Sequence, residues 1–369
     1  MTSPKRVIEV FDSLEISGGV QAVVMNVIRN ADHQRVTIDV AVYQNPESNS
    51  YAAEVIENGG NVYSVRNLSS CGPTSFYRQF YTLFKKGGYD AVHAHNLHHN
   101  GLILLAAKRA GVPMRISHAH QSYDDRNASF SRRSVAKGLC KINNKVATRR
   151  VACSDLAGRF LYGKKSFEFL PNAVDFNRFS IEESKEELRL RYGIPLDANV
   201  LLHIGRFSLE KNQLFLVDVM KKLDDGNCKL FMVGDGSLFD EFVRNVNDAA
   251  LQSKIECLGI RSDVPELLKL ADWLLLPSLN EGLPVVVVEA QAVGCPSIVS
   301  DLVTKQVDLG LGLVEFATIE TPEIWADRVR MGSLQRHFNP EEVKAKMVAM
   351  KYEITANLDA WYELYGCGE

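Results

Sequence analysis

The chain has 369 residues, 46% of them hydrophobic and 24% charged, which is typical of a soluble globular enzyme with more than one core. A net charge of −3 offers no general attraction to nucleic acid, so no nucleic-acid partner is expected. The seven cysteines are scattered and never form C-x-x-C, which favours reduced thiols over a disulfide framework or a structural zinc site. No signal peptide and no apolar run of about 18 residues is found, so we expect a cytoplasmic protein without a transmembrane span.

The first half of the chain alternates short apolar runs with helical patterns. Strands are predicted at residues 6–10, 37–42, 61–65, 91–95, 115–118, 151–153 and 167–170. Helices are predicted at residues 20–29 and 102–110, and the second of these is expected to end at Gly111, just before Pro113.

The alternation begins again after a charged helix predicted at residues 184–192. Further strands are predicted at residues 200–204, 229–233, 254–257, 273–276 and 296–299, separated by helices such as 213–223 and 238–251. This pattern in both halves predicts an α/β protein with two doubly wound parallel sheets. Ligands of such sheets bind at the carboxyl ends of the strands, so two facing domains predict a cleft between them.

The most apolar stretch is N-E-G-L-P-V-V-V-V-E-A-Q-A-V-G, at residues 280–294, where Glu281 and Glu289 bracket four valines. One interpretation is a helix from Pro284 to Val293 that ends at Gly294, with its amino end facing a phosphate and with Glu289 bound to sugar hydroxyls. The alternative is a buried strand between two solvated charges, because length alone does not separate a short helix from a strand.

A second candidate anion site lies in H-I-G-R-F-S-L-E-K-N-Q, at residues 203–213. Arg206 and Lys211 follow a predicted strand, where a guanidinium and an ammonium would suit a diphosphate. The alternative is a pair of ordinary surface charges.

Two glycine turns also follow predicted strands. Gly18 and Gly19 stand at the first strand-to-helix turn, and V-G-D-G-S-L places Gly234 at a later one. Glycines let backbone donors approach a ligand closely, although G-x-G-x-x-G, the dinucleotide pattern, is absent. Each turn is a weak signal by itself.

Six of the nine histidines lie at or beyond the ends of two predicted strands in the first domain. Side chains along a strand alternate between faces, and no acidic or cysteine partner follows at ligand spacing, so no metal is expected. A polar site for a hydroxylated ligand is the favoured interpretation, and packing or capping is the alternative for at least three of these histidines. They are His93, His95, His98, His99, His118 and His120.

Residues 131–150 contain no acidic side chain and predict a basic amphipathic helix. Val135, Leu139, Ile142 and Val146 are expected on its apolar face. Such a helix can lie on an anionic membrane surface, and the alternative is an ordinary solvated face. The expected cationic stripe consists of Arg133, Lys137, Lys141, Lys145 and Arg149.

These segments together resemble glycosyltransferase family 4, the retaining enzymes of the GT-B fold, over most of the chain. The resemblance rests on G-R-F-S-x-x-K-N-Q, V-G-D-G, L-G-I-R-S-D-V-P-E-L-L and P-S-L-N-E-G-L-P-V-V-V-V-E-A-Q-A-V-G-C-P, whose E-x7-E is the most specific. With R-I-S-H-A-H, C-S-D-L-A-G and S-D-L-V-T, the chain looks most like the bacterial branch that assembles exopolysaccharide and capsule. It departs from the family at Pro171-Asn172-Ala173, where glycine usually follows the asparagine.

The resemblance implies two Rossmann-like domains that face each other across a cleft. The acceptor domain would span residues 1–173 and the nucleotide-sugar domain residues 174–349, with a C-terminal helix at about 350–369 that packs back on the first. A nucleotide-diphosphate sugar, with UDP-sugar favoured, would donate to a saccharide or polyprenyl-linked acceptor. The protein would then lie on the inner face of the plasma membrane and need no cofactor or metal.

The resemblance also assigns roles to single residues. The catalytic group would be His120, Arg206, Lys211 and Glu281. Donor contacts would come from Gly18, Gly19, Gly205, Arg206, Lys211, Gly234, Ile260, Arg261, Glu281, Gly282, Leu283, Pro284 and Glu289. Weaker acceptor contacts would come from His95, Asn96, His118 and His120. The alternatives are a nucleotide-sugar epimerase and a non-catalytic subunit that binds a nucleotide sugar.

Overall fold

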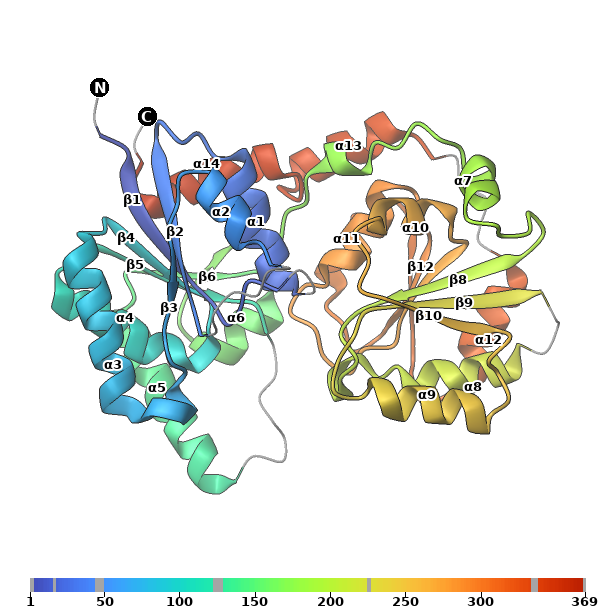
Figure 1. Ribbon diagram of the computed structural model, residues 1–369, viewed down its shortest axis with the longest axis horizontal. Helices are drawn as coiled ribbons and strands as arrows, with labels where there is room; N and C mark the ends of the chain where they lie inside the picture. The colour runs from blue at the N-terminus through green and yellow to red at the C-terminus, as the bar shows by residue number, and fades with distance from the viewer. Residues whose placement is uncertain are drawn as a thin grey trace. The chain divides into compact units, whose positions relative to one another are not determined.

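The structure is a computed structural model, and it describes residues 3–15, 18–43, 50–121, 129–223, 227–332 and 338–367. The chain forms two compact units, and Figure 1 labels their elements. Unit 1 comprises Met1–Ala173 with Ile354–Glu369, and unit 2 comprises Val174–Glu353. The chain therefore returns to unit 1 after residue 353, and each unit is described separately.

Unit 1 is built on a parallel sheet in which seven strands follow the order β3-β2-β1-β4-β5-β6-β7. The order reverses between β1 and β4, so this is a doubly wound sheet with its switch point there. The strands are β1 (Lys5–Val10), β2 (Val36–Val42), β3 (Val62–Ser64), β4 (Ala91–Ala94), β5 (Met114–Ala119), β6 (Arg149–Ala152) and β7 (Glu168–Phe169).

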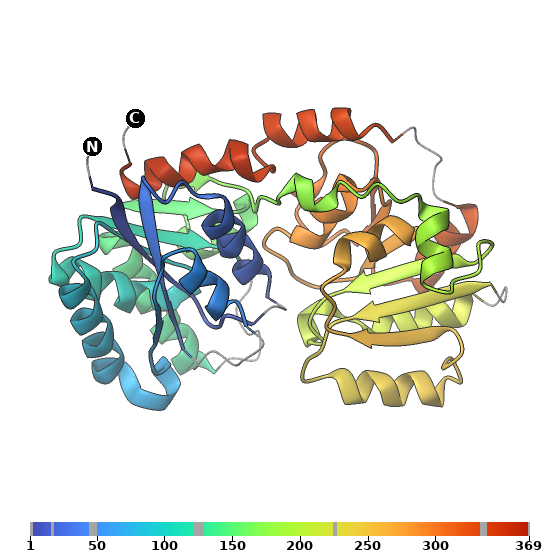
Figure 2. The same ribbon diagram turned by 45° about the horizontal axis from the view of Figure 1, so that its top comes forward.

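Helices cover both faces of this sheet. Helices α3, α4 and α5 lie side by side on one face, and α1 packs with α14 on the other (Figures 1 and 2). Phe76, Phe80 and Phe84 of α3 are buried in the core between helix and sheet. The helices are α1 (Gly19–Asn30), α2 (Ala52–Glu57), α3 (Leu68–Gly87), α4 (Asn100–Ala110), α5 (Phe130–Val146), α6 (Asp155–Tyr162) and α14 (Ile354–Tyr365), with a short η1 (Leu97–His99).

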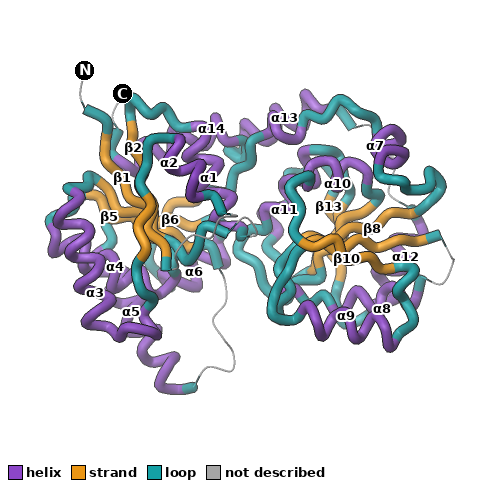
Figure 3. The backbone as a smooth tube through the Cα atoms, viewed as in Figure 1, coloured by secondary structure: helices purple, strands orange, loops and turns teal. Residues whose placement is uncertain are grey.

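Unit 2 repeats the architecture with a parallel sheet of six strands in the order β10-β9-β8-β11-β12-β13. Its switch point lies between β8 and β11, and Figure 3 shows its strands enclosed by helices. The strands are β8 (Asn199–Ile204), β9 (Cys228–Val233), β10 (Ile255–Gly259), β11 (Trp273–Leu276), β12 (Ser297–Ser300) and β13 (Val314–Ala317).

Helices α8, α9 and α12 cover one face of this second sheet, and α10 and α11 cover the other (Figure 1). Its core contains the buried rings of Phe207, Trp273 and Trp325. The helices are α7 (Lys185–Arg191), α8 (Leu214–Lys222), α9 (Phe239–Asp248), α10 (Val264–Leu270), α11 (Val285–Ala292), α12 (Pro322–Met331) and α13 (Pro340–Ala349), with short turns η2 (Phe176–Phe179) and η3 (Leu209–Lys211).

The predicted fold class is confirmed, because both halves are doubly wound parallel sheets flanked by helices. The interpretation of the valine run as a helix is also confirmed, since Val285–Ala292 form α11. Pro284, the predicted first residue, occupies the N-cap position, so the helix begins one residue later than predicted. Among the helices that the structure describes, none is long and apolar enough to cross a bilayer.

Candidate functional site

The predicted donor residues of unit 2 follow strands whose carboxyl ends meet at one edge of the sheet. Gly205 follows β8, Gly234 follows β9, Ile260 follows β10, and Glu281 lies in the loop after β11. In a doubly wound sheet this edge, beside the switch point, is where ligands bind. The fold therefore brings residues from four separate segments of the sequence to one side of unit 2.

The backbones at Gly205 and Gly234 are in close contact. Gly205 donates its N–H to the carbonyl of Val233 at 3.0 Å, and a Cβ on Gly234 would lie 2.2 Å from the Gly205 oxygen. Gly234 also has φ +134°, a conformation that side chains disfavour. Only glycine fits this buried position, where the backbones that follow β8 and β9 meet.

Lys211 and Glu281 form an ion pair at this edge. Lys211 Nζ lies 2.6 Å from Glu281 Oε1, which also accepts a hydrogen bond from Ser278 Oγ at 2.8 Å. The two charged side chains are 22% and 13% exposed, so the pair is partly shielded yet open to a ligand. Arg206, in the same β8–α8 connection, has an exposed side chain. A cation and a carboxylate that the sequence separates by 70 residues thus meet.

Helix α11 begins directly after the loop that carries Glu281. Its four valines are buried, which explains why β-favouring residues are helical here: tertiary packing overrides local preference. Gly282 and Leu283 are buried in the loop before the helix. Glu289 lies in the middle of α11, where burial raises its carboxyl pKa from 4.5 to about 7, and the charge of Arg178 partly opposes this.

The turn after β10 carries an exposed apolar side chain, Ile260, and an arginine that is already paired, Arg261. Ile260 is exposed, whereas Arg261 donates from Nε to Asp263 Oδ1 at 2.8 Å. The hydroxyl of Tyr192 also donates to Asp263. The Arg261 guanidinium is therefore already paired with a carboxylate, although its side chain is 37% exposed.

His203 is a buried residue of this edge that the motifs do not identify. Its Nδ1 is 2.8 Å from the carbonyl oxygen of Leu275, which makes Nδ1 the protonated nitrogen. Its Nε2 has no hydrogen-bond partner among the described residues and would lie 3.3 Å from a Cβ on Gly205. Burial lowers the pKa of His203 to about 4, so it is a neutral acceptor. A histidine in an apolar strand was its only sequence signal.

In unit 1, Gly18 and Gly19 form the amino end of α1. Gly18 is the N-cap residue, with an extended backbone and no side-chain cap, and a Cβ there would lie 1.9 Å from the amide oxygen of Gln21. Gly19 is exposed and faces open space. Ser17, which the sequence groups with them, lies outside the described residues. The turn presents bare backbone, as a ligand-approach role requires.

Four histidines converge at the carboxyl ends of β4 and β5. The rings of His93 and His95 have centroids 4.3 Å apart, and those of His118 and His120 are 4.0 Å apart. The argument from strand alternation was wrong here, because residues two apart on a strand share a face. The six histidines do not form one set, since His98 and His99 lie in η1.

Glu9 of β1 is the acidic partner that the sequence pattern missed. Its Oε2 lies 2.6 Å from His95 Nε2, and its Oε1 lies 3.3 Å from His93 Nδ1 and accepts a 2.6 Å hydrogen bond from the hydroxyl of Tyr365. The search for a partner at ligand spacing along the sequence could not find it, because Glu9 comes from another strand. A carboxylate in the apolar run R-V-I-E-V-F was the available signal.

The hydrogen-bond network continues from His95 through His120 to Asn172. His95 Nδ1 is 2.8 Å from His120 Nε2, and His120 Nδ1 is 3.1 Å from Asn172 Oδ1. A second branch joins His93 Nε2 to His118 Nδ1 at 3.2 Å. All these side chains are buried, so the predicted acceptor residues present little surface in this conformation.

Burial dominates the protonation of this network. It lowers the pKa of His95 to about 4 and lowers the pKa of His120 well below its usual range. Burial would raise the pKa of Glu9, but the charges and hydrogen bonds of His93 and His95 together hold it well below the usual range. The centre of the network is thus an ionised carboxylate within hydrogen-bond distance of His95 and close to His93.

Among the described residues, one group could hold a metal ion. The ligand atoms of His93, His95 and His118 lie within 4.8 Å of one another. Both ring nitrogens of His95 already take part in hydrogen bonds, with Glu9 and His120. Coordination by His95 would have to break one of these bonds.

Asn96, the remaining predicted acceptor residue, has a structural task. Its backbone N–H bonds to Asn100 Oδ1 and its side-chain amide donates to Asp12 Oδ1, both at 2.7 Å. The first bond joins the end of β4 to the start of α4, and the second joins it to the segment after β1. Asn96 is buried, and its amide oxygen has no hydrogen-bond partner among the described residues.

The basic helix is shorter than predicted. Helix α5 ends at Val146, and Arg149 instead begins β6, where it forms an ion pair with Glu168 at 2.5 Å. Arg149 is therefore not part of the stripe, because a strand starts where the cationic spacing continues. Val135 is also not on the apolar face: it is 60% exposed, and Ala136, not Val135, is buried there.

The four other cations of the stripe lie on α5 and are exposed. At 100° per residue they centre on the side of the helix opposite Ala136, Leu139, Asn143 and Val146, which are buried. The remaining stripe consists of Arg133, Lys137, Lys141 and Lys145.

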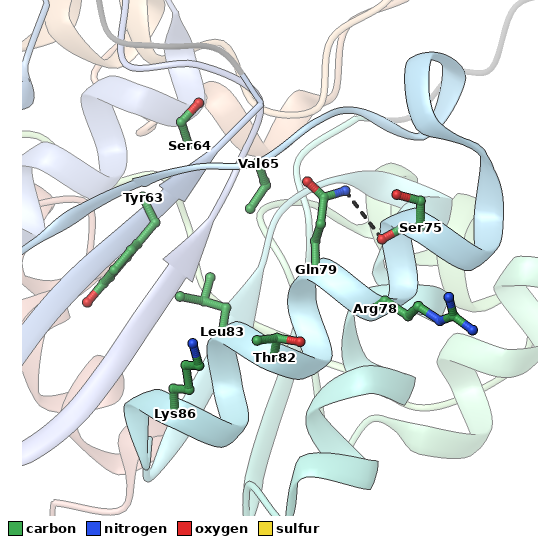
Figure 4. A pocket seen from close by; sticks show the side chains of 9 residues that line it. All are labelled: Tyr63, Ser64, Val65, Ser75, Arg78, Gln79, Thr82, Leu83 and Lys86. Carbon is green, nitrogen blue, oxygen red and sulfur yellow. Dashed lines mark hydrogen bonds between the residues drawn. The ribbon is translucent and has the colours of Figure 1, made fainter.

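A surface pocket of about 490 Å³ lies in unit 1 between β3 and α3, and Figure 4 shows its lining. Tyr63, Val65 and Leu83 supply its apolar part, and Arg78 and Lys86 add positive charge. None of the predicted site residues lines it. The pocket is therefore distinct from the strand ends described above.

The sequence matches two family models. Residues 17–178 match "Glycosyltransferase Family 4", and residues 184–308 match "Glycosyl transferases group 1". The chain is 32% identical to the putative glycosyltransferase EpsF of Bacillus subtilis, over 99% of this chain and 97% of that protein. It is 31% identical, over 64% of each chain, to the UDP-Gal:α-D-GlcNAc-diphosphoundecaprenol α-1,3-galactosyltransferase of Escherichia coli.

A solved structure shares the fold. HepE of Anabaena, crystallised in complex with UDP and glucose, is 17% identical, with a TM-score of 0.79 over 98% of this chain and 99% of that one. Two doubly wound units, together with this similarity, define the GT-B fold. The sequence matches then identify the family: the chain belongs to glycosyltransferase family 4.

Proposed function

We propose that the protein transfers a sugar from a nucleotide-diphosphate sugar, preferably a UDP-sugar, to a saccharide or polyprenyl-linked saccharide during surface polysaccharide assembly. The donor class is supported by HepE, crystallised with UDP-glucose, and by the E. coli relative, whose name specifies UDP-Gal. The acceptor class is supported by that relative's diphosphoundecaprenol substrate and by similarity to the capsular glycosyltransferase CapH of Staphylococcus aureus, 29% identical over 73% of this chain.

The contact between Lys211 and Glu281 is the observation that carries this proposal. At 2.6 Å, the cation for a departing diphosphate and the carboxylate for sugar hydroxyls are adjacent. A sugar joined to a diphosphate requires these two chemistries next to each other. Arg206, from the same connection as Lys211, adds a second cation, and Glu289 offers an acceptor for ribose hydroxyls.

The mechanism follows from where charge develops. As the bond from the anomeric carbon to the phosphate oxygen breaks, negative charge grows on the diphosphate, and Arg206 and Lys211 stabilise it. We propose that the acceptor oxygen bonds to the anomeric carbon on the face that the phosphate leaves, and that its proton passes to a phosphate oxygen. This route retains the anomeric configuration and needs no metal ion.

Unit 1 would bind the acceptor and dock on the membrane. Gly18 and Gly19 would approach the donor phosphates with bare backbone, and His120 would lie by the reacting sugar. The exposed lysines of α5 would attract anionic lipid headgroups, each contributing about 1 kcal/mol near the surface. A lipid-linked acceptor would then be concentrated where the enzyme is docked.

Two measurements test the proposal. A thermal-shift screen with uridine, guanosine and adenosine diphosphate sugars should show the largest stabilisation with a UDP-sugar, because a bound donor raises stability by mass action. Labelled donor should then yield free nucleotide and a glycosylated lipid-linked acceptor with the donor's anomeric configuration. Conversion of the donor without acceptor would indicate an epimerase, and tight binding without nucleotide release would indicate a non-catalytic subunit.

A further inference from the structure

His203, near the carboxyl end of β8, has one ring nitrogen that the fold leaves without a partner among the residues that the structure describes. The ring is fully buried, and its Nδ1 lies 2.8 Å from the carbonyl oxygen of Leu275. A carbonyl oxygen only accepts, so Nδ1 carries the hydrogen of the neutral ring and Nε2 is a bare lone pair. This lone pair is buried and accepts no hydrogen bond from any described residue. Burying an acceptor without a donor costs stability, which points to a use for it elsewhere in the working cycle.

The side chain of Lys211 lies beside the same lone pair. A Cβ on Gly205 would lie 3.3 Å from His203 Nε2, and 3.3 Å and 3.4 Å from Cδ and Cε of Lys211. Because Gly205 has no side chain, the imidazole and the lysine stem share this space. The electrostatics agree with this placement, since the charge of Lys211 adds to burial in lowering the pKa of His203. The Lys211 ammonium has three N–H donors, and one of them bonds to Glu281 at 2.6 Å.

We propose that His203 is a positioning residue for Lys211. When a donor occupies the site, Nε2 of His203 accepts a hydrogen bond from the ammonium and holds it against the diphosphate. This inference rests on the proposed function, in which the diphosphate draws Lys211 away from Glu281. His203 acts through Lys211 alone, because its own side chain is fully buried.

A neutral acceptor suits this task better than a second carboxylate. While no donor is bound, Glu281 holds Lys211 in an ion pair and offsets its charge. An imidazole lone pair orients the ammonium without an opposing charge, so the positive charge stays available for the diphosphate as the anomeric bond breaks. An interaction that matters most in the transition state affects kcat more than KM.

The test is a long-range 1H–15N correlation spectrum of the full chain labelled with 15N-histidine, in which loss of signals in His203→Gln identifies those of His203. Without nucleotide, Nδ1 should be protonated and Nε2 bare, and a protonated Nε2 would overturn the proposal. The probe is whichever of UDP, GDP and ADP stabilises the protein most in thermal melts. Saturation with this nucleotide should shift the Nε2 resonance toward that of a hydrogen-bonded acceptor. An unchanged Nε2 resonance would overturn the proposal.

Lys211→Met shows whether the ammonium causes the shift, because it keeps an unbranched stem and removes all three donors. The shift should disappear in this variant at saturating nucleotide, and a shift that persists would overturn the proposal. Lys221→Met is the matched control. Lys221 is an exposed lysine of α8 that pairs with Asp218, so its replacement should leave the shift intact.

Two substitutions of His203 separate hydrogen bonding from packing. His203→Phe keeps a buried ring but has no acceptor, whereas His203→Gln loses the ring but carries a donor for Leu275 and an acceptor for Lys211. For the donor sugar that the thermal-shift screen selects, kcat should fall at least about tenfold in His203→Phe, with little change in KM. The loss in His203→Gln should be smaller. A packing role predicts the reverse order of the two variants, and that order would overturn the proposal.

Failure of this inference differs from failure of the proposed function. A protein that binds the nucleotide and shows the Nε2 shift but transfers no sugar would refute the proposed function alone. A protein that transfers sugar without the shift would refute the role of His203 alone. If none of the three nucleotides stabilises the protein, the proposed donor class is wrong and the inference falls with it.

Discussion

Glu289 makes a prediction that separates a donor-binding carboxylate from a structural one. Burial raises its pKa from 4.5 to about 7, so between these pH values the folded protein holds a proton that the unfolded chain has lost. Stability contributed by this group is therefore present in acid and falls as pH rises through that window. Glu289→Gln cannot ionise, so the variant should lose no stability there.

The size of the effect follows from the two pKa values. A change from 4.5 to about 7 corresponds to about 3 kcal/mol at full burial, and we expect about 2 kcal/mol because Glu289 keeps partial access to solvent. Glu289→Gln should therefore be more stable than the wild type at pH 8 and nearly equal at pH 4.5. For a unit of this size, about 2 kcal/mol raises Tm by about 4–8 °C.

Tryptophan fluorescence can follow unit 2 alone. Trp273 and Trp325 lie in unit 2 and Trp361 in unit 1, so a Trp361→Phe background reports unfolding of the unit that contains Glu289. Thermal melts at several pH values would compare Glu289→Gln with Glu256→Gln, whose side chain is 49% exposed and pairs with Lys229.

The same variant should bind nucleotide more weakly, because a neutral amide accepts ribose hydroxyls less strongly than a carboxylate. A gain in stability at high pH together with a loss of nucleotide affinity is the expected combination. An equal Tm difference at pH 4.5 and pH 8 would show that Glu289 is not a buried carboxylate that costs stability when ionised. Unchanged affinity for UDP would refute its proposed contact with the ribose.

The other residues make predictions of the same kind. Lys211→Ala should lower kcat, measured by nucleotide release, by about 10²–10³-fold without unfolding unit 2. Lys221→Ala on α8 should have the kcat of the wild type. A kcat near that of the wild type in Lys211→Ala would refute the contact with the diphosphate. Gly234→Ala should destabilise unit 2 by about 2–4 kcal/mol in thermal melts, because the new Cβ would lie 2.2 Å from a carbonyl oxygen. Gly332→Ala, also at positive φ but in open space, should cost less, and equal costs would contradict the steric argument. Replacing the three exposed stripe lysines by glutamate should lower partition onto anionic vesicles at least about 100-fold. Arg149→Ala should not change it, because Arg149 is not part of the stripe. Retained binding of the triple variant would refute membrane binding by the stripe. The three lysines are Lys137, Lys141 and Lys145.

Glycine and proline residues at helix ends explain which elements the sequence predicts well. Gly111 and Pro113 mark the end of α4, and the structure ends that helix at Ala110 with Gly111 in the left-handed conformation. Pro284 and Gly294 likewise bracket α11, although its valines favour strands. In both cases residues with restricted or unusual backbone conformations set the limits, so composition between them matters less.

Helix α3 shows where such signals are insufficient. Gly72 and Pro73 interrupt its first turns, with non-helical φ and ψ at Gly72, so the segment does not have the pattern of a long helix. Phe76, Phe80 and Phe84 nevertheless recur every four residues and are buried. Their contribution depends on packing against the sheet, which local preference does not contain.

The network around Glu9 could not be predicted for a different reason. Glu9 meets His95 across 86 residues and Tyr365 across 356, and the contacts depend on the return of α14 to unit 1. The sequence showed the histidines and a carboxylate in an apolar strand as separate observations. Only the order of β1 beside β4 in the sheet brings them together.

The pair of Lys211 and Glu281 shows how one contact can serve both the free and the occupied site. Without a donor, each charge is neutralised by the other, so neither is left unpaired in a partly shielded position. A diphosphate would compete with Glu281 for Lys211, and sugar hydroxyls would compete with Lys211 for Glu281. A donor that carries both groups would therefore give each side chain a new partner when the ion pair breaks. Ser278 donates a 2.8 Å hydrogen bond to Glu281, which would hold the carboxylate in place if the lysine turned to a phosphate. A nucleotide without a sugar would give a new partner to Lys211 only, so the position of Glu281 would matter less for its binding. We therefore expect Ser278→Ala to weaken binding of a UDP-sugar more than binding of UDP.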